Sequence, residues 1–205
     1  MDKQRGTLLV VSGPAGSGKG TVLGNLLKDT SKYVYSVSAT TRSPRPGEVD
    51  GKQYFFLTKE KFLSLVSEDS FLEHAEYVGN YYGTLRSFVE EKLEEGKNVI
   101  LEIEVQGALQ IREKMPEAML IFLCPPDYAT LENRLRGRGT ETDEVIRKRL
   151  ATALEEIKIA AGYDYLVVNE DGKSLECAEK IDGIVNDRPE KSKENILNFI
   201  KNFTE

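Results

Sequence analysis

The chain has 205 residues, of which 40% are hydrophobic and 30% charged, a composition typical of a soluble globular domain. Its formal net charge of −6 argues against binding nucleic acid or an anionic membrane through bulk charge. The polar amino terminus, the lack of apolar runs near the ~20 residues of a membrane helix, and two cysteines without metal-ligand spacing predict a cytoplasmic protein.

A phosphate-binding loop is predicted near the amino terminus. The apolar run from Thr7 to Val11 has the pattern of a buried strand, and a glycine-rich segment separates it from a helix-like stretch. Glycines let a backbone adopt positive φ angles and approach an anion, and N–H groups at a helix start point at phosphate oxygens. A turn that merely joins strand to helix is the plain alternative. The loop comprises Gly13, Pro14, Ala15, Gly16, Ser17, Gly18, Lys19, Gly20 and Thr21.

Lys19 supplies a positive charge for terminal phosphates. The residue after such a lysine is usually Ser or Thr, whose hydroxyl ligates Mg²⁺. Here that residue is Gly20, and the hydroxyl follows one position later at Thr21. Direct metal ligation by the loop therefore stays open, with Thr21 as its candidate.

Residues 34–95 interrupt the regular alternation of strands and helices. Tyr33 to Ser38 alternates like a half-buried strand, Tyr54 to Leu57 is strand-like, and Thr58 is placed to cap a helix. Two more strand-like runs flank a turn predicted at Gly79-Asn80. We therefore expect a small mixed β lobe inserted into a larger fold.

Two arginines in this lobe are candidates for binding a phosphate. Arg42 and Arg45 lie in a segment stiffened by Pro44 and Pro46, and two guanidinium groups on a rigid loop suit a phosphate with several oxygens. A polar turn with exposed arginines is the alternative. The lobe's tyrosines could complete a phosphate site, stack on a base, or form the lobe's core; they include Tyr54, Tyr81 and Tyr82.

Glu102 and Glu104 end the second buried strand-like run, which begins at Asn98. Ligands bind at the carboxyl ends of parallel strands, and alternation along a strand puts both carboxylates on one face. They are candidates for holding Mg²⁺ or its water shell, and a structural ion pair with an arginine is the alternative. His74, the only histidine, is expected to pack rather than to catalyse.

Two more apolar runs, Met119 to Cys124 and Tyr165 to Val168, complete a set of four. Such runs fit parallel strands that are buried on both faces. Helical patterns lie between them or follow them, at residues 106–114, 128–136 and 143–161. Alternating strands and helices predict an α/β fold with a doubly wound parallel sheet.

Basic residues around two glycines predict a hinged lid that carries positive charge over a transferring phosphoryl group. A solvated basic helix face is the alternative. The segment runs from Arg134 through Arg136, Gly137, Arg138 and Gly139 to Arg147, Lys148 and Arg149.

The chain's last segment, from Arg188 onward, is mostly polar. Ile196, Ile200 and Phe203 recur there at helical spacing. This pattern predicts a helix that docks on the core, with a partner-binding helix as the alternative.

Together these segments resemble the guanylate kinases, enzymes that phosphorylate GMP with ATP. The resemblance covers residues 6–185. It rests on Gly13-Pro14 with Gly18-Lys19, on Thr40-Thr41-Arg42 with Pro44-Arg45, on Gly79-Asn80-Tyr81-Tyr82-Gly83, and on Gly137-Arg138-Gly139-Thr140-Glu141.

The resemblance implies a three-layer α/β/α core of the P-loop NTPase type with an inserted mixed β lobe that binds GMP and a lid. The expected core is 6–33 and 97–185, the lobe 34–96, the lid about 134–150, and the helical tail 186–205.

The resemblance also implies the binding residues. The guanine contacts would be Ser38, Glu73 and Thr84, and the GMP phosphate contacts Arg42, Arg45, Tyr54 and Tyr82. ATP would bind the loop from Gly13 to Thr21, with Asn169 beside its base. The catalytic charges around the transferred phosphoryl group would be Lys19, Arg134, Arg138 and Arg149.

The implied reaction is transfer of the γ-phosphoryl group of ATP to GMP, and also to dGMP, as part of purine nucleotide metabolism and GTP supply. Mg²⁺ would accompany ATP, held through water or nucleotide, with Thr21, Glu102 and Glu104 as candidates. The partners are small nucleotides, without nucleic acid or membrane, and the sequence favours neither a monomer nor a homo-oligomer. Two alternative hypotheses remain: a catalytically silent module that binds protein ligands, and a kinase for another nucleoside monophosphate.

Overall fold

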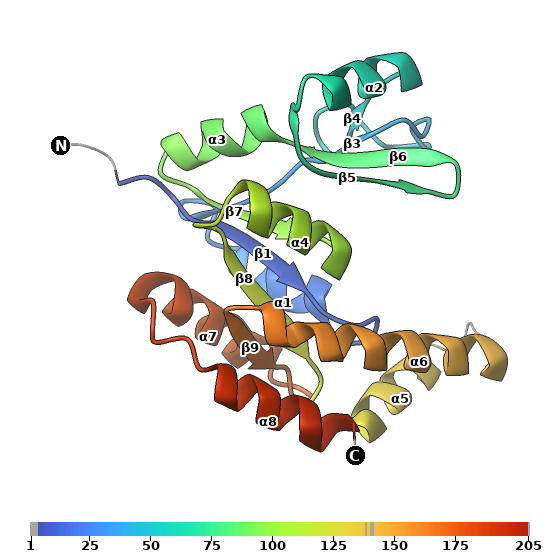
Figure 1. Ribbon diagram of the computed structural model, residues 1–205, viewed down its shortest axis with the longest axis vertical. Helices are drawn as coiled ribbons and strands as arrows, with labels where there is room; N and C mark the ends of the chain where they lie inside the picture. The colour runs from blue at the N-terminus through green and yellow to red at the C-terminus, as the bar shows by residue number, and fades with distance from the viewer. Residues whose placement is uncertain (1–3, 138, 140–141, 205) are drawn as a thin grey trace. The chain divides into compact units, whose positions relative to one another are not determined.

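The computed structural model describes residues 4–137, 139 and 142–204. The chain divides into two compact units (Figure 1). Within the described residues, the first unit comprises 4–9, 30–101 and 106–118, and the second comprises 10–29, 102–105 and 119–204.

The strands, in chain order, are β1 (Leu8–Ser12), β2 (Tyr33–Tyr35), β3 (Ala39–Thr40), β4 (Phe55–Phe56), β5 (Phe71–Tyr77), β6 (Asn80–Leu85), β7 (Asn98–Glu102), β8 (Met119–Cys124) and β9 (Tyr165–Val168). The helices are α1 (Lys19–Leu26), α2 (Lys59–Ser67), α3 (Arg86–Glu94), α4 (Val105–Lys114), α5 (Tyr128–Arg136), α6 (Asp143–Ile159), the 3₁₀ helix η1 (Ala160–Gly162), α7 (Ser174–Asp187) and α8 (Lys193–Thr204).

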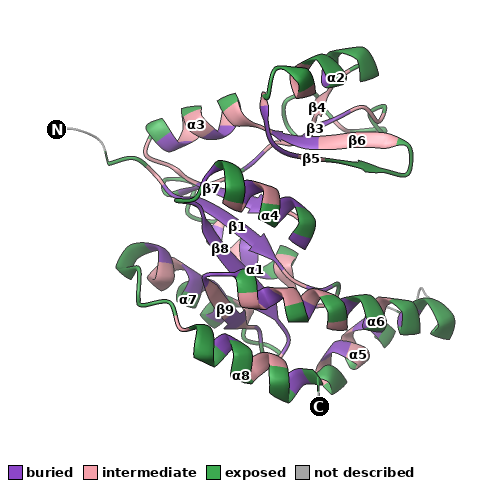
Figure 2. Cartoon of the chain, in the orientation of Figure 1, coloured by how far each residue is buried: buried purple, intermediate pink, exposed green. Residues whose placement is uncertain are grey.

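A five-stranded sheet has the strand order β2-β7-β1-β8-β9. Its β2–β7 and β8–β9 pairs are parallel, as predicted for strands connected by helices. The four apolar runs of the sequence form β1, β7, β8 and β9, and β1 and β8 are buried along their whole length (Figure 2). The expected α/β fold is thus confirmed.

The strand expected at Tyr33 to Ser38 was wrongly assigned to the inserted lobe. Only Tyr33–Tyr35 forms a strand, and it pairs with β7 in the five-stranded sheet, with Val34 opposite Val99. Short half-buried alternation reports exposure on one face and carries no information about which sheet receives the strand.

The first unit contains a second sheet with the order β4-β3-β6-β5, in which β3–β6 and β5–β6 are antiparallel. The β5–β6 hairpin turns at Val78 and Gly79, one residue earlier than predicted, because Asn80 already pairs with Tyr77. Both turn residues have positive φ, 48° and 74°, as a two-residue hairpin turn of type I′ requires. Such a φ strains a β-branched valine, so sequence preference pointed to the wrong pair.

The lobe's own core consists of Ala39, Phe62 and Phe71, with partly buried apolar side chains packed around them. Phe62 lies on α2, which begins as predicted at Thr58, whose hydroxyl accepts a hydrogen bond from the Lys61 backbone N–H. The Phe62 ring stacks on Phe71 and on Tyr81, and its edge contacts His74. His74 therefore packs against aromatic residues, as predicted.

In the second unit, α1 packs against α7, α5 against α6, and the tail helix α8 against η1 and α6. The tail buries Ile196 and Phe203, so the docked helix expected there is confirmed. Cys124 on β8 and Cys177 on α7 are both buried free thiols. Among the described residues, none of the helices has the length and apolar content needed to cross a membrane.

Candidate functional site

The glycine-rich loop, residues 13–21, joins β1 to α1 in the second unit as the sequence predicts. Gly13, Gly16 and Gly18 all have positive φ, at 154°, 94° and 85°. A Cβ atom on Gly13 would lie 2.0 Å from the Leu123 carbonyl oxygen, and one on Gly18 would lie 2.4 Å from the Asn169 side-chain nitrogen. Two of these glycines are therefore required both by backbone angle and by space.

Asn169 braces this loop. Its Nδ2 donates a hydrogen bond of 2.8 Å to the Ser17 carbonyl, and its backbone N–H donates to the carbonyl of Cys124 at the end of β8. The Asn169 Oδ1 and the Ser17 hydroxyl are buried and have no hydrogen-bond partner among the described residues. Two buried polar atoms at the loop, one on Ser17 and one on the neighbouring Asn169, are thus left unsatisfied by the described residues.

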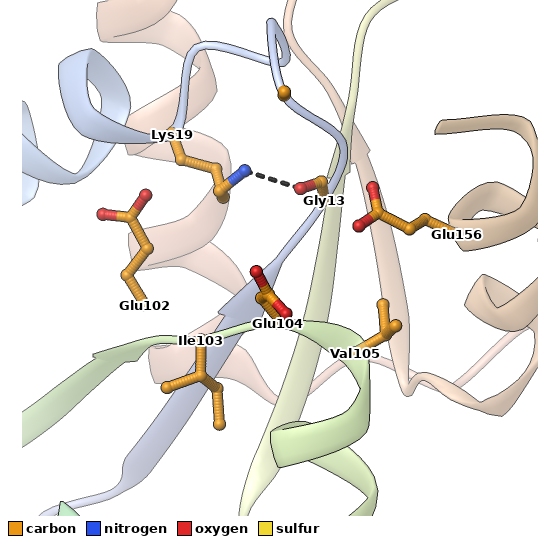
Figure 3. A pocket seen from close by; sticks show the side chains of 8 residues that line it. Gly13, Lys19, Glu102, Ile103, Glu104, Val105 and Glu156 are labelled. Carbon is orange, nitrogen blue, oxygen red and sulfur yellow. Dashed lines mark hydrogen bonds between the residues drawn. The ribbon is translucent and has the colours of Figure 1, made fainter. Parts of the chain in front are cut away.

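Lys19, the first residue of α1, bends back over the loop. Its Nζ donates to the carbonyl oxygen of Gly13 at 2.6 Å (Figure 3) and to that of Pro14 at 3.2 Å. The ammonium group also faces a cavity of about 370 Å³. That cavity is lined by Gly13, Ala15, Lys19, Glu102, Ile103, Glu104, Val105 and Glu156.

Glu102 and Glu104 line the same cavity as Lys19. The expectation that both carboxylates lie on one face of a strand is wrong, because β7 ends at Glu102 and Glu104 lies beyond the strand, before α4. The Ser12 hydroxyl donates to the Ile103 carbonyl at 2.8 Å, which ties the end of β1 to the segment between the two glutamates.

Glu156 is a third carboxylate at this cavity, which the sequence did not reveal (Figure 3). Burial raises the pKa of Glu156; the nearby Lys19 charge opposes this rise, and the Glu104 charge adds to it. Glu156 belongs to α6, and in the sequence it is one of several charged residues of the helical pattern predicted there. No local signal in the sequence distinguishes it from Glu155, its exposed neighbour.

Arg134, at the end of α5, lies against the glycine-rich loop. Its Nη1 donates to the carbonyl oxygens of Gly16 at 3.4 Å and Ser17 at 3.5 Å, and its Nη2 to that of Asn169 at 2.7 Å. Its Nε and Nη2 both donate to Asp171, at 2.9 and 2.7 Å. The guanidinium thus joins the loop to the segment after β9.

The remaining second-unit candidates are less tightly placed. Thr21 is exposed on α1, and Arg149 is partly buried on α6. Arg138 lies outside the described residues, as do Thr140 and Glu141 of the expected lid motif. No group of three or more His, Cys, Asp or Glu side chains in the described part of the chain is arranged to hold a metal ion directly.

Glu73 and Thr84 face each other on β5 and β6 of the first unit. Glu73 is only 7% exposed, and the Thr84 hydroxyl donates to its Oε1 at 2.7 Å. Burial raises the pKa of Glu73, against the opposing effect of the hydrogen bonds from Thr84. Ser38, the third predicted base contact, is partly buried directly before β3. Burial of a carboxylate is costly unless hydrogen-bond donors compensate, and Thr84 supplies one such donor to Glu73.

A second cluster in this unit gathers the predicted phosphate contacts. The Arg42 guanidinium lies 5.5 Å from the centre of the Tyr54 ring, and the Tyr54 and Tyr82 rings meet edge to face at 6.1 Å. Hydrogen bonds to Glu48, and more weakly one to Tyr82, raise the pKa of Arg42. Arg45 is exposed on the same loop. Glu48 is a further residue that the sequence analysis missed.

Comparisons with known proteins agree with the family resemblance found in the sequence. The family model described as guanylate kinase matches residues 5–186. A guanylate kinase of Halalkalibacterium halodurans is 56% identical over 171 residues, covering 83% of this chain and 84% of that protein. One from Lactococcus lactis is 51% identical over 183 residues, covering 89% of this chain and 88% of that protein. The crystal structure of guanylate kinase from Anaplasma phagocytophilum matches with a TM-score of 0.66 and 35% identity, over 94% of this chain and 91% of that one.

Proposed function

The chain belongs to the guanylate kinase family and is an enzyme that phosphorylates GMP to GDP with ATP, and we propose how its two units divide that task. The second unit binds ATP through the glycine-rich loop. The first unit binds GMP through Glu73 and the Arg42 cluster. The role is in purine nucleotide metabolism and GTP supply, with dGMP as a second acceptor. The buried free thiols support a cytoplasmic location.

On the ATP side, the loop's N–H groups and the start of α1 hold the phosphates. Lys19 exchanges its carbonyl contacts with Gly13 and Pro14 for phosphate oxygens, because a charged partner attracts an ammonium group more strongly than a neutral carbonyl does. Arg134 keeps the loop in shape through its backbone contacts and adds positive charge nearby. Asn169 borders the adenine base.

Charge on the moving phosphoryl group is stabilised by Lys19 together with Arg138 and Arg149. Phosphoryl transfer forms no covalent bond to the protein, so positioning and charge neutralisation supply the catalysis. Each correctly placed cation of this kind contributes about 10²–10³-fold in rate.

Mg²⁺ enters with ATP. Carboxylates suit this hard cation, which commonly takes one or two of them together with waters and substrate phosphates. Glu102 and Glu104 at the Lys19 cavity fit such indirect binding. The exposed Thr21 hydroxyl is the remaining candidate. When bound, Mg²⁺ would neutralise phosphate charge, and Glu102, Glu104 and Thr21 would hold its water shell.

On the GMP side, Glu73 accepts hydrogen bonds from the N1–H and N2–H₂ groups of guanine, while the hydroxyls of Ser38 and Thr84 also contact the base. Arg42, Arg45, Tyr54 and Tyr82 hold the phosphate. Adenine presents a bare N1 acceptor in place of a donor, which would leave the buried Glu73 carboxylate unpaired. A mismatch of this kind can reject the wrong substrate by on the order of 10⁴-fold.

The observation that carries this assignment is the buried Glu73 carboxylate with Thr84 as its partner on the neighbouring strand. The test is an acceptor screen with ATP and Mg²⁺, comparing GMP, dGMP, AMP, CMP and UMP in a coupled ADP assay. GMP should be the best acceptor, and Glu73→Gln should lower its kcat/KM by about 10²-fold while narrowing the gap to AMP. Equal turnover of AMP and GMP by the unaltered enzyme would refute the assignment.

A further inference from the structure

The arginine loop, residues 41–49, contains a tight turn that returns Glu48 towards Arg42. The Glu48 backbone N–H donates to the Arg45 carbonyl at 3.0 Å, which closes the turn. Pro46 and Gly47 occupy its two central positions, and Gly47 has a φ of 88°. A proline followed by a residue with positive φ is the pattern of a type II turn, so the return of the chain is built into the sequence.

The Glu48 carboxylate binds this loop at three points. Its Oε2 accepts from Arg42 Nη1 at 3.0 Å and its Oε1 from Arg42 Nη2 at 2.9 Å. Its Oε2 also accepts from the Arg45 backbone N–H at 2.6 Å. The side chains of Arg42 and Glu48 are only 17% and 18% exposed. The hydrogen bond from Arg42, followed by that from Arg45, lowers the pKa of Glu48, so the carboxylate stays ionised at neutral pH.

These contacts use only one edge of the guanidinium. The second N–H of Nη1 donates to the Ser43 carbonyl at 2.7 Å. Two N–H groups of Arg42, one on Nε and one on Nη2, take part in none of these hydrogen bonds to described residues. The Tyr82 hydroxyl also interacts with the guanidinium. The two N–H groups lie parallel on a single edge, which matches two oxygens of a phosphate.

The planar group is also fixed from its face. The ring centres of Tyr54 and Phe56 lie 5.5 and 5.8 Å from the guanidinium carbon of Arg42. A carboxylate at one edge and aromatic rings nearby leave the group little freedom to rotate, so its open edge is presented in a set direction before a ligand arrives.

We infer that Glu48 is a positioning residue for the acceptor phosphate: it holds Arg42 by one edge so that the other edge binds the phosphate of GMP. This inference rests on the proposed GMP site. The opposite possibility is that Glu48 competes with the phosphate for Arg42 and must be displaced. The two differ in sign, because removing a positioning carboxylate weakens GMP binding and removing a competitor strengthens it.

The test compares Glu48→Gln with the unaltered enzyme, using GMP and guanosine as probes in calorimetric titrations. Glutamine keeps the size of the side chain and loses the charge and the second acceptor oxygen. We expect the Kd and KM for GMP to rise about tenfold, with the Kd for guanosine and the KM for ATP changed less than about twofold. Glu76→Gln, an exposed carboxylate on β5 of the same unit, is the matched control.

The outcomes separate cleanly. Tighter GMP binding by Glu48→Gln, or an unchanged Kd for GMP, overturns the inference. Equal weakening of GMP and guanosine also overturns it, because that result means a generally loosened lobe. If Glu48→Gln does not fold, Glu48→Asp decides, and its KM for GMP should rise about threefold or more because its carboxylate is one methylene shorter. If the unaltered enzyme fails to phosphorylate GMP, the proposed function fails instead.

Discussion

The glycine-rich loop and the arginine loop both have the means to hold phosphate, but they are constructed differently. In the glycine-rich loop the proposed anion-binding groups are backbone N–H groups, and the backbone is held by positive φ angles and by close contacts with Leu123 and Asn169. In the arginine loop the proposed binding group is the Arg42 side chain, which is held by hydrogen bonds to Glu48. Backbone geometry fixes the first site, whereas a side-chain ion pair fixes the second.

We expect the largest effect on the reaction rate from a change at Lys19, the long side chain of the glycine-rich loop. Lys19→Ala should lower kcat by about 10²–10³-fold, because it removes a charge aimed at the transferred phosphoryl group. A coupled ADP assay at saturating GMP measures this. Lys28→Ala is the control, since Lys28 is exposed just beyond α1 and its Nζ donates an exposed hydrogen bond to Asn25. A rate near that of the unaltered enzyme would remove Lys19 from the mechanism.

The arginine loop should be the more sensitive site to an exchange of arginine for lysine. Arg42→Lys loses the two-edged guanidinium and should raise the KM for GMP by about tenfold or more. Arg45 is exposed, and its hydrogen bond to Glu48 comes from the backbone, so Arg45→Lys should raise that KM by less than about threefold. Steady-state kinetics with varied GMP test the difference, and equal effects would contradict the role given to the Arg42–Glu48 pair.

The backbone character of the glycine-rich loop is tested by Gly18→Ala. The change forces alanine to a φ of 85° and places its Cβ 2.4 Å from Asn169. We expect a loss of about 1–3 kcal/mol in the free energy of unfolding together with weaker ATP binding. Gly24→Ala, inside α1, is the control, because an added Cβ there meets nothing within 4 Å, and it should stabilise the fold by about 0.5–1 kcal/mol. Urea denaturation compares the two variants.

The smallest effect concerns the buried carboxylate of the base site. The pKa of Glu73 in the folded protein is raised above its ordinary 4.5, so the folded state binds this proton more tightly than the unfolded state does. Stability from this group is therefore present at acidic pH and is lost as the pH rises through the raised value. Glu73→Gln should be more stable than the unaltered enzyme by up to about 1 kcal/mol at neutral pH.

That gain from Glu73→Gln should shrink as the pH falls towards about 5. Urea melts at both pH values, with the exposed Glu76→Gln as reference, measure it. A variant that is less stable than the unaltered enzyme at neutral pH would mean that the Thr84 hydrogen bond outweighs the cost of burying the charge.

The sequence predicted the backbone-based part of the molecule well. Four non-alternating apolar runs identified β1, β7, β8 and β9, and the glycines between β1 and α1 identified the loop, because both signals are local. The pairing of β2 with β7 and the turn at Val78 were missed, because they depend on sheet assembly and on strain that the tertiary structure imposes.

Side-chain partners were predicted less completely. Arg42, Tyr54 and Tyr82 were named and do cluster, but Glu48 was overlooked because only the type II turn brings it back to Arg42. Glu156 was overlooked because α6 delivers it to the Lys19 cavity from more than a hundred residues away along the chain. Charged residues on loops and helix faces acquire their partners from the fold, and sequence spacing alone does not disclose them.

Both cysteines of the chain, Cys124 and Cys177, are buried in the second unit. Burial raises the pKa of both thiols, that of Cys177 to about 11, so neither is a ready nucleophile in the closed fold. Their thiol–disulfide exchange with a disulfide reagent, which forms a mixed disulfide and releases the reagent's other thiolate, therefore requires the second unit to open. The rate at which such a reagent modifies the two thiols will therefore show how far bound nucleotide slows the opening of the second unit. The same rate carries no information on opening of the first unit, which contains neither cysteine.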